Sequence, residues 1–454
     1  RTCYSGDYTG QSILNSLLKK VNSLKIPIYD SQYVTDLLIE DGYCFGAMSF
    51  NTTNGERTIH LADAIVICTG GHTRIWKKSS SRKQENTGDG YHLALKAGCE
   101  LMDMEMVQFH PTGMVIPEDI AGTLVTEAVR GEGGKLINNK GERFMINYDP
   151  DRMELSTRDR VAIANYTEII EGRGSQNGGV YLDISYKDKD FIIKKIPKIY
   201  RQFIETQMID ISKQPMEVAP TAHYSMGGIY VTAEEHSTNI RGLFAAGEVA
   251  GGLHGANRLG GNSLAEILIF GKRAGKAASA YSKYLSLHPR SSRVINLSHE
   301  NINSLIRNGD ELVIPLQYRL SNLMWNYCGV IKDHEKLTKG LAKLQEIKDR
   351  SQCLDVRIGD QNYQDLIGIF DLKASITTAE ATIKTAIERK ESRGAHQRSD
   401  FPSLSKSEDC NYKVKLRNGS LDISKNKLEP LDHDLKCLID ETIKITDFKD
   451  KLLE

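Results

Sequence analysis

The chain has 454 residues, and its 59 lysines and arginines are balanced by 59 aspartates and glutamates. This length suggests about three folding units, and the zero formal net charge argues against nucleic acid or an anionic membrane surface as a general partner. The 8 cysteines form no CxxC or CxxxC pair, which argues against a zinc site, an iron–sulfur cluster or a disulfide framework, so no metal site is predicted.

The first hundred residues alternate between helical and strand-like segments. Apolar residues at helical spacing predict a helix over residues 10–24, and the alternating pattern that follows predicts strands within residues 26–51. We therefore expect an α/β domain whose first part covers residues 1–102.

A short β-branched run at residues 61–71 (LADAIVICTGG) ends in Thr69, Gly70 and Gly71. This composition is typical of a buried central strand that stops where the backbone must come close to a ligand. A glycine turn and a second predicted helix follow at residues 88–101.

Changes in composition divide the rest of the chain into four parts. Residues 103–216 are rich in turns and charged residues and predict an inserted domain. The glycine-rich strand and helix pattern returns at residues 217–290, so we expect the α/β domain to be split around the insert. Residues 291–400 show apolar positions three and four apart and predict a helical bundle. Residues 401–454 are expected to form a polar C-terminal tail.

Three side chains that can bind anions lie in short segments of glycine, proline and small residues. His110 stands in QFHPTG, His223 in PTAHYSMGG and Arg258 in HGANRLGGNS. Each histidine alone fits an ordinary structural role, but functional groups are often displayed on such loops. Two imidazoles and a guanidinium suit a small dianion, because arginine binds a carboxylate through two parallel bonds. A dicarboxylate is the natural candidate ligand.

Two further segments carry polar residues at helical spacing. TEAVRGEGG places Thr126, Glu127 and Arg130 within one turn, where Glu127 and Arg130 fit an ordinary ion pair on one face. STRD opens another predicted helix, with Ser156 as its cap. From spacing alone, neither segment indicates a catalytic site.

Longer motifs give the chain a family resemblance. It resembles the flavoprotein subunit of succinate dehydrogenases and fumarate reductases through, in this order, QFHPTG, TEAVRGEGGKLINNKGERFM, STRD, PTAHYSMGGIYV, GLFAAGEVAGGLHGANRLGGNSLAEILIFG and ESRGAHQRSDFP. The resemblance runs from Arg1 to about Pro402. It implies a Rossmann-like α/β FAD-binding domain, an inserted α+β capping domain and a C-terminal helical bundle, in agreement with the changes in composition.

The resemblance implies a role for each side chain of the predicted dianion site. His110 and Thr126 would hold one carboxylate of the substrate, and His223 and Arg258 would hold the other. Arg158 would be the general acid/base, acting on the carbon next to the one that exchanges a hydride with flavin N5. The positive groups would also stabilise charge that develops on the substrate in the transition state.

Arginine is an unusual base, since its unperturbed pKa lies far above 7. In the family a relay supplies the proton, and Glu127 and Arg130 match that relay in this sequence. Arg158, Glu127 and Arg130 are therefore the expected catalytic group.

The resemblance also places the cofactor, FAD, and gives the HGANRLGGNS segment a second role. Asn262, Ser263 and Leu264 would bring their backbone under the flavin ring. The other residues expected against FAD are Thr69, Gly70, Gly71, Asp89 and Glu248. Without the resemblance these five fit a strand end and two turn carboxylates.

Two features of the family are missing from this sequence. One is the glycine-rich fingerprint that cradles the FAD pyrophosphate at a helix N-terminus, and the other is the histidine that can bond covalently to the flavin. Both would precede Arg1, so we expect the first part of the parent protein to be absent and the chain alone to bind FAD poorly. The stretch after Pro402 also matches the family weakly.

Three alternatives stay open. L-aspartate oxidase shares the fold and the HPT and HGANR motifs, although HYSMGG, LGGNSLAE and SRGAHQRSD resemble the dehydrogenase and reductase group more closely. Within that group a thiol-dependent fumarate reductase fits as well, and the direction of catalysis is undetermined. A non-catalytic remnant that only assembles with a partner is a different class of hypothesis, and the complete set of site residues argues against it.

The expected partners follow from the same resemblance. Electrons that leave the flavin need an acceptor, which in the family is an iron–sulfur subunit that in turn binds membrane-anchor subunits. The sequence has no apolar run near the roughly 18 to 20 residues of a membrane span. We therefore expect a peripheral chain, attached through its partners on the cytoplasmic or matrix side of a membrane.

Overall fold

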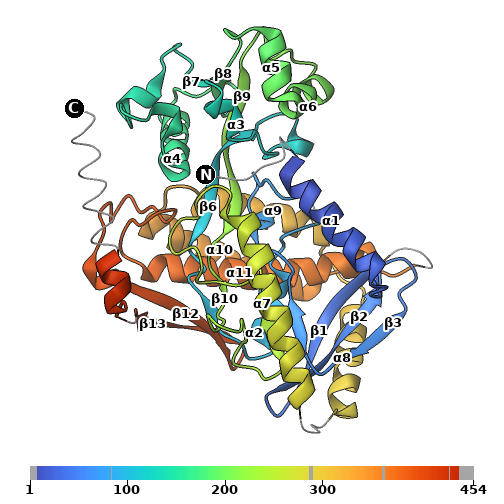
Figure 1. The fold of residues 1–454 in the computed structure, drawn as a ribbon. Helices are drawn as coiled ribbons and strands as arrows, with labels where there is room; N and C mark the ends of the chain where they lie inside the picture. Colours follow the sequence, from blue (N-terminus) through green and yellow to red (C-terminus); the bar gives the residue numbers. More distant parts are fainter. Residues whose placement is uncertain (1–7, 83, 286–289, 360–362, 429, 439–454) are drawn as a thin grey trace.

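The computed structural model describes residues 8–82, 84–285, 290–359, 363–428 and 430–438. Figure 1 shows a smaller unit of strands and helices, coloured teal and green, that stands above the larger remainder of the molecule. The two parts meet where the long strands β6 and β9 run from one into the other.

The described residues form both helices and strands. The helices are α1 (Thr9–Ser23), α2 (Asp89–Lys96), α3 (Ala128–Gly131), α4 (Arg158–Ile170), α5 (Lys189–Lys195), α6 (Pro197–Gln207), α7 (Asn262–Tyr284), α8 (Ser292–Leu305), α9 (Val313–Tyr327), α10 (His334–Arg350) and α11 (Gln364–Glu388). The strands are β1 (Gln32–Glu40), β2 (Tyr43–Asn51), β3 (Arg57–Leu61), β4 (Ile65–Ile67), β5 (Leu101–Met102), β6 (Val107–Met114), β7 (Lys135–Ile137), β8 (Val180–Asp183), β9 (Met216–Ser225), β10 (Gly228–Ile229), β11 (Leu243–Ala245), β12 (Cys410–Arg417) and β13 (Ser420–Lys427). These elements confirm the predicted mixture of α/β, α+β and helical parts.

The sheets place the ends of distant strands together. β1, β2 and β3 form one antiparallel sheet, and β11 pairs in parallel with β4. The other two sheets have the orders β6-β9-β8-β7 and β10-β5-β12-β13. Since β4 and β11 are parallel, their carboxyl ends lie at one edge, and there the chain continues into Thr69 after β4 and toward Glu248 after β11.

The predicted insert has a buried core of its own. That core consists of apolar residues between Met114 and Val218 and lies under α4, α5 and α6. Its sheet contains all of β9, up to Ser225, so the sheet continues past the boundary expected at residue 216. The domain boundaries themselves stay a prediction.

Helices α8 to α11 confirm the helical character predicted for residues 291–400. α10 begins where Asp333 caps it, the carboxylate accepting the backbone N–H of Lys336 at 2.8 Å. α11 is the most enclosed of these helices, and its apolar residues join those of α9 and α10 in a core that also takes in side chains of β1 and β2.

The C-terminal part differs from the polar tail expected for residues 401–454. β12 and β13 form a hairpin that pairs with β5, and Val414 and Leu421 are buried in the core of the α/β part. Asn418 and Gly419 make the two-residue turn, both with positive φ. Asn-Gly is the preferred sequence for such turns, so a polar tail, as expected for residues 401–454, does not describe these two strands.

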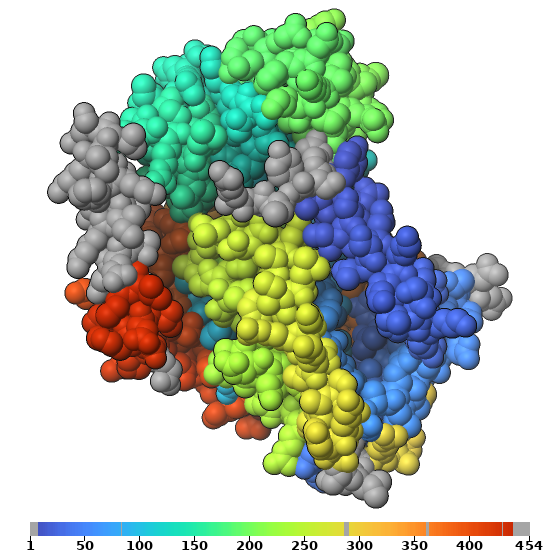
Figure 2. Space-filling model, in the orientation of Figure 1, coloured from blue at the N-terminus to red at the C-terminus, as the bar shows by residue number. Residues whose placement is uncertain are grey.

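Two helices lie at the surface of one face. Figure 2 shows α1 in blue and α7 in yellow on that face. α1 is the helix predicted over residues 10–24, but it buries none of its residues. The amphipathic pattern therefore predicted the helix correctly, although its apolar side is not packed.

Candidate active site

Neighbouring strands bring together the two predicted histidines. His110 on β6 pairs with Thr221 on β9, and His223 lies two residues further along β9. A register shift makes His223 the extra residue on β9 between the pairs Gln108–Tyr224 and Phe109–Ala222, and the two imidazole ring centroids are 5.3 Å apart. The predicted anion-binding rings are therefore direct neighbours.

Local hydrogen bonds fix the state of His110. Its Nδ1 accepts the backbone N–H of Thr112 at 3.2 Å. A backbone amide can only donate, so the proton of the neutral ring must be on Nε2. Burial lowers the pKa of His110 well below its ordinary value, and the nearby His223 and Arg158 lower it further. His110 thus supplies a neutral Nε2–H donor.

The segment that contains Ser80 runs beside β9 and supports His223. The Nδ1 atom of His223 is 2.8 Å from the Oγ of Ser80, and the Ser80 N–H donates to the carbonyl of Ala222. Burial, followed by the charges of Arg258 and Arg158, lowers the pKa of His223 to about 3. This ring too is neutral at physiological pH.

Arg258, the cation of HGANRLGGNS, is 4% exposed. It donates from Nη1 to Ser263 Oγ at 3.2 Å and from Nη2 to Gln108 Oε1 at 3.1 Å, while its Nε is buried without a hydrogen-bond partner. Burial and then the charge of Arg158 lower its pKa to about 10, so it remains a cation at pH 7. A buried cation that hydrogen-bonds only to neutral groups is suited to receive an anion.

Arg158 and Glu127 form the second charged centre. Nε and Nη2 of Arg158 each lie 2.8 Å from Oε2 of Glu127. Arg130 is 4.0 Å from the same carboxylate and donates from Nη1 to the carbonyl of Glu154 at 2.6 Å. The ordinary Glu127 to Arg130 pair that the spacing suggested is therefore the weaker contact, and Glu127 links both arginines.

A glycine of HGANRLGGNS makes room for this centre. A Cβ atom at Gly260 would lie 3.3 Å from Nη2 of Arg158 and 3.7 Å from Oε2 of Glu127. The small residues thus allow the Arg258 loop to pass beside the pair formed by Arg158 and Glu127.

The predicted cap at Ser156 was wrong. The N-cap residue of α4 is Thr157, and it makes no side-chain cap bond. Ser156 donates from Oγ to the carboxylate of Asp149 at 2.6 Å instead. A bond to an ionised acceptor is stronger than one to a backbone amide, which explains the preference.

Sequence reasoning missed Gln108, which joins the two charged centres. Its Oε1 accepts from Arg258 at 3.1 Å and from Arg158 at 3.3 Å, and its Nε2 donates to Asn257 Oδ1 and to the Arg258 carbonyl. Gln108 belongs to the QFHPTG motif, but its uncharged amide gave no sign of this role in the sequence.

Unpaired buried donors gather in this site. Nine buried side-chain nitrogen and oxygen atoms of the described residues lack a hydrogen-bond partner, and four of them belong to Thr126, Arg130 and Arg258. Most buried polar groups in proteins are paired, so such a cluster needs an explanation. A bound anion with several acceptor oxygens would satisfy it.

Among the residues expected against FAD, Thr69, Gly70 and Gly71 follow the carboxyl end of β4, and Glu248 follows that of β11. Glu248 accepts the backbone N–H of Ser225 at 3.0 Å, and a Cβ atom at Gly71 would lie 2.3 Å from its Oε1. A Cβ atom at Gly70 would lie 2.2 Å from Asn86 Oδ1. These two glycines therefore make room for protein side chains.

The chemistry of these residues fits a dinucleotide cofactor. Burial raises the pKa of Glu248 to about 7 and raises that of Asp89, at the start of α2. α7 begins at Asn262 without a side-chain cap, so its first N–H groups are suited to electronegative ligand atoms. Buried carboxylates suit ribose hydroxyls, and the carboxyl ends of parallel strands are where α/β folds bind nucleotides.

Two families match the chain. Residues 1–264 match a family described as FAD binding domain. Residues 317–434 match one described as fumarate reductase flavoprotein C-term.

Curated relatives match over most of the chain. It is 44% identical over 403 residues to a Methanothermobacter marburgensis protein named as one of the subunits of fumarate reductase (CoM/CoB), covering 88% of this chain and 73% of that protein. It is 35% identical over 425 residues to the "Succinate dehydrogenase flavoprotein subunit" of Rickettsia conorii, covering 88% and 69%.

Solved structures share the fold. The Mycobacterium smegmatis Sdh1 complex in its apo form aligns with a TM-score of 0.85 at 35% identity, covering 96% of this chain and 75% of that one. A quinol–fumarate reductase with menaquinol molecules aligns with a TM-score of 0.88 at 31% identity, covering 94% and 77%.

Proposed function

Because the chain belongs to the flavoprotein-subunit family of succinate dehydrogenases and fumarate reductases, we propose that it interconverts succinate and fumarate with FAD as its cofactor. The cluster of unpaired buried donors at Thr126, Arg130 and Arg258 carries this proposal. Neutral imidazoles and a buried guanidinium select a small dianion over larger or neutral ligands.

The two carboxylates of the substrate bind to different groups. His110, through its Nε2–H, and Thr126, through its hydroxyl, hold one carboxylate, while His223 and Arg258 hold the other. The charge of Arg158 contributes to the lowered pKa of both His223 and Arg258. The positive charges of Arg158 and Arg258 repel each other. A bound dianion relieves this repulsion, and the relief favours dianion binding.

Arg158 moves the proton. During succinate oxidation Arg158 passes one guanidinium proton to Glu127 and takes a proton from one methylene carbon, while the neighbouring carbon loses a hydride; fumarate reduction reverses these transfers. Glu127, which touches Arg158 and is half-exposed, connects it with solvent. Gln108 keeps Arg158 and Arg258 in a fixed relation by accepting from both.

FAD, when bound, supplies the two-electron acceptor or donor for this reaction. The residues that would hold it are Thr69, Gly70, Gly71, Asp89, Glu248, Asn262, Ser263 and Leu264. Their placement at the carboxyl ends of β4 and β11 and at the start of α7 supports this assignment.

The chain works with partner subunits. Its relatives are named as subunits, and we propose that its electron partner is an iron–sulfur subunit, through which it is attached peripherally to membrane-anchor subunits. Among the residues that the structure describes, no helix is long and apolar enough to cross a bilayer.

The test is made on the purified, washed holoenzyme by visible absorption. Succinate should bleach the bound flavin and fumarate should restore its colour. Arg158→Ala should keep its flavin but lose about 10²- to 10⁴-fold in kcat, the usual contribution of a general acid or base. Arg160→Ala is the matched control, because Arg160 lies on the same helix but is mostly exposed.

Each other outcome points to a named alternative. Flavin that responds to L-aspartate but not to succinate would make the protein an aspartate oxidase. Full-length protein, purified together with its partner subunits, that holds no flavin would support the non-catalytic remnant. Full activity in Arg158→Ala would reject Arg158 as the proton donor.

A further inference from the structure

The tyrosine that follows His223 lies against the substrate arginine. The guanidinium carbon of Arg258 stands 4.2 Å from the centre of the Tyr224 ring. Tyr224 is 6% exposed and Arg258 is 4% exposed, so little water screens the attraction between the cation and the ring face. One face of the guanidinium is thereby covered by the ring, and its N–H edge is left for ligands.

Glu266 and His254 hold the Tyr224 ring in place. The hydroxyl of Tyr224 donates to Oε2 of Glu266 on α7, and Nε2 of His254 lies 2.8 Å from the same oxygen. The His254 ring meets the Tyr224 ring nearly edge-on, with centroids 5.5 Å apart. Glu266 is 3% exposed. Tyr224, Glu266 and His254 thus form one buried network that does not include the reacting groups.

The network also ties the Arg258 loop to two elements. Tyr224 belongs to β9, Glu266 to α7, and His254 opens the HGANRLGGNS segment four residues before Arg258. A shift of the loop would break contacts to both elements. Gln108 and Ser263 hold the guanidinium by its Nη2 and Nη1 atoms, and the Tyr224 ring lies against the guanidinium plane, where it limits the tilt.

We infer that Tyr224 is a positioning residue for dicarboxylate binding, because its ring sets the plane in which the Arg258 guanidinium meets a substrate carboxylate. Glu266 and His254 hold that ring in place. This inference rests on the proposed function, since it assigns Tyr224 to the same anion site. It adds to that site a requirement for an aromatic ring.

The experiment compares substitutions in the holoenzyme. Tyr224→Leu removes the ring and should raise KM for succinate and for fumarate, and Kd for the non-reacting dicarboxylate malonate, by about tenfold. The kcat value should fall less, since the proton-transfer residues are untouched. Tyr224→Phe keeps the ring and should stay within about threefold of wild type.

A matched control lies outside the site. The ring of Tyr412 covers Arg389 at 4.8 Å, and its hydroxyl donates to Glu408 at 2.6 Å. Tyr412→Leu should therefore lose stability while leaving every dicarboxylate KM unchanged. If Tyr224→Leu does not accumulate as folded protein, Tyr224→Met, which also lacks the ring, replaces it in the comparison.

A double-mutant cycle makes the test specific. With Arg258→Met in the background, Tyr224→Leu should have no further effect on malonate Kd, because both substitutions remove the same interaction. Equal Kd values for wild type and folded Tyr224→Leu would overturn the inference, as would a Phe variant as weak as the Leu variant. A wild-type holoenzyme that binds no dicarboxylate would instead refute the proposed function.

Discussion

Arg389 and Arg258 are both buried, with 1% and 4% of their surface exposed, but their N–H groups are used differently. Arg389 donates from Nε to Glu105, from Nη1 to Glu391 and the Glu408 carbonyl, and from Nη2 to Asp103 and the Cys410 carbonyl. All of its donors are thus used within the protein. Arg258 leaves its Nε unpaired.

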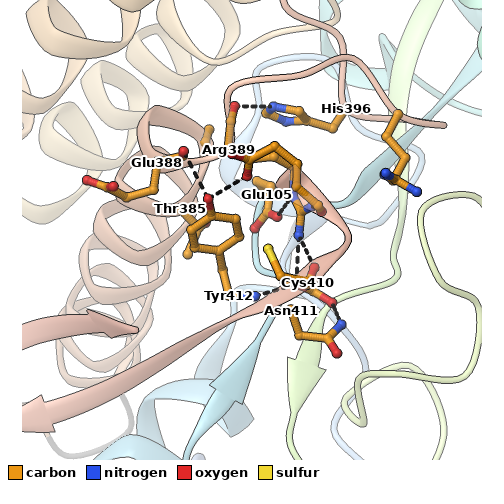
Figure 3. A network of polar contacts seen from close by, with 12 residues as sticks. Glu105, Thr385, Glu388, Arg389, His396, Cys410, Asn411 and Tyr412 are labelled. Carbon is orange, nitrogen blue, oxygen red and sulfur yellow. Dashed lines mark hydrogen bonds and ion pairs between the residues drawn. The ribbon is translucent and has the colours of Figure 1, made fainter. Parts of the chain in front are cut away.

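Figure 3 shows Arg389 between Glu105 and the backbone at Cys410, close to Tyr412. Burial alone would lower the pKa of Arg389, but Glu105 and Asp103 raise it above its ordinary value. For Arg258 burial and a neighbouring arginine lower the pKa to about 10. A guanidinium that is hydrogen-bonded to carboxylates stabilises the fold, whereas one that is hydrogen-bonded only to neutral groups is available to an anion.

The largest expected effect is on stability, from Arg389→Met. It leaves Asp103 and Glu105 without their counterion, and breaking a buried charge cluster costs about 3–5 kcal/mol. Thermal unfolding followed by circular dichroism should show a large fall in Tm. Arg417→Met is the control, because Arg417 forms only an exposed pair with Asp422 and should change the free energy of unfolding by less than about 1 kcal/mol. Similar Tm values for both variants would contradict a structural role for Arg389.

Arg258→Met should weaken dicarboxylate binding strongly and change stability only slightly, the opposite of Arg389→Met. Removing one charged partner of a buried pair costs about 2–5 kcal/mol of binding, so Kd for malonate should rise about 100- to 1,000-fold in a titration of flavin absorption. The free energy of unfolding should change by only about 1 kcal/mol, because Arg258 hydrogen-bonds no carboxylate. A loss of stability as large as that of Arg389→Met would remove the distinction between the two arginines.

Glu248, near Arg258, should make stability depend on pH. Burial raises its pKa from 4.5 to about 7, so between these values the folded protein holds a proton that the unfolded chain releases. Its contribution to stability is complete below pH 4.5 and is lost as pH rises to about 7, by on the order of 3 kcal/mol.

Urea unfolding of the flavin-free protein at several pH values measures this loss. Glu248→Gln should remove the part of the slope that this carboxyl group contributes in that window, while Glu118→Gln, at an exposed position, should follow wild type. Parallel curves for Glu248→Gln and wild type would show that the carboxyl group is not shifted.

The smallest effect should come from a single hydroxyl. Thr126→Val removes a buried Oγ1 that has no partner, so stability should stay the same or rise by about 1 kcal/mol. KM for succinate should rise about three- to tenfold. Thr385→Val removes a hydroxyl that donates to the Ala381 carbonyl at 2.8 Å and should lower stability by about 0.5–1 kcal/mol with KM unchanged. The same sign of stability change in both variants would contradict the comparison.

Much of the fold could be predicted from periodicity. The helix at residues 10–24 and the helices of residues 291–400 follow the 3.6-residue repeat, which reports local structure directly. The β12–β13 hairpin was missed because lysines alternate with Tyr412 and Val414, so the strand resembled a polar tail. Its Asn418-Gly419 turn was a usable signal.

The site was predictable only in its parts. Short motifs indicated His110, His223 and Arg258; in the structure the two imidazole rings are neighbours, and the charge of Arg258 helps to lower the pKa of His223. Gln108 gives no sign of its role in sequence, since an uncharged amide acquires that role only from the two arginines that it contacts. Such contacts depend on strand register and on loops that meet in space, which local patterns do not contain.

The Arg389 cluster also fixes an order of events in time. Arg389 follows Glu105 by 284 residues, and a ribosome that adds about 5–20 residues per second needs roughly 15 to 60 s to synthesise that distance. During this interval Asp103 and Glu105 have no counterion and must stay in water. The charges of the segment that leads into β6 therefore gain this counterion only after Arg389, the residue that follows α11, has been synthesised.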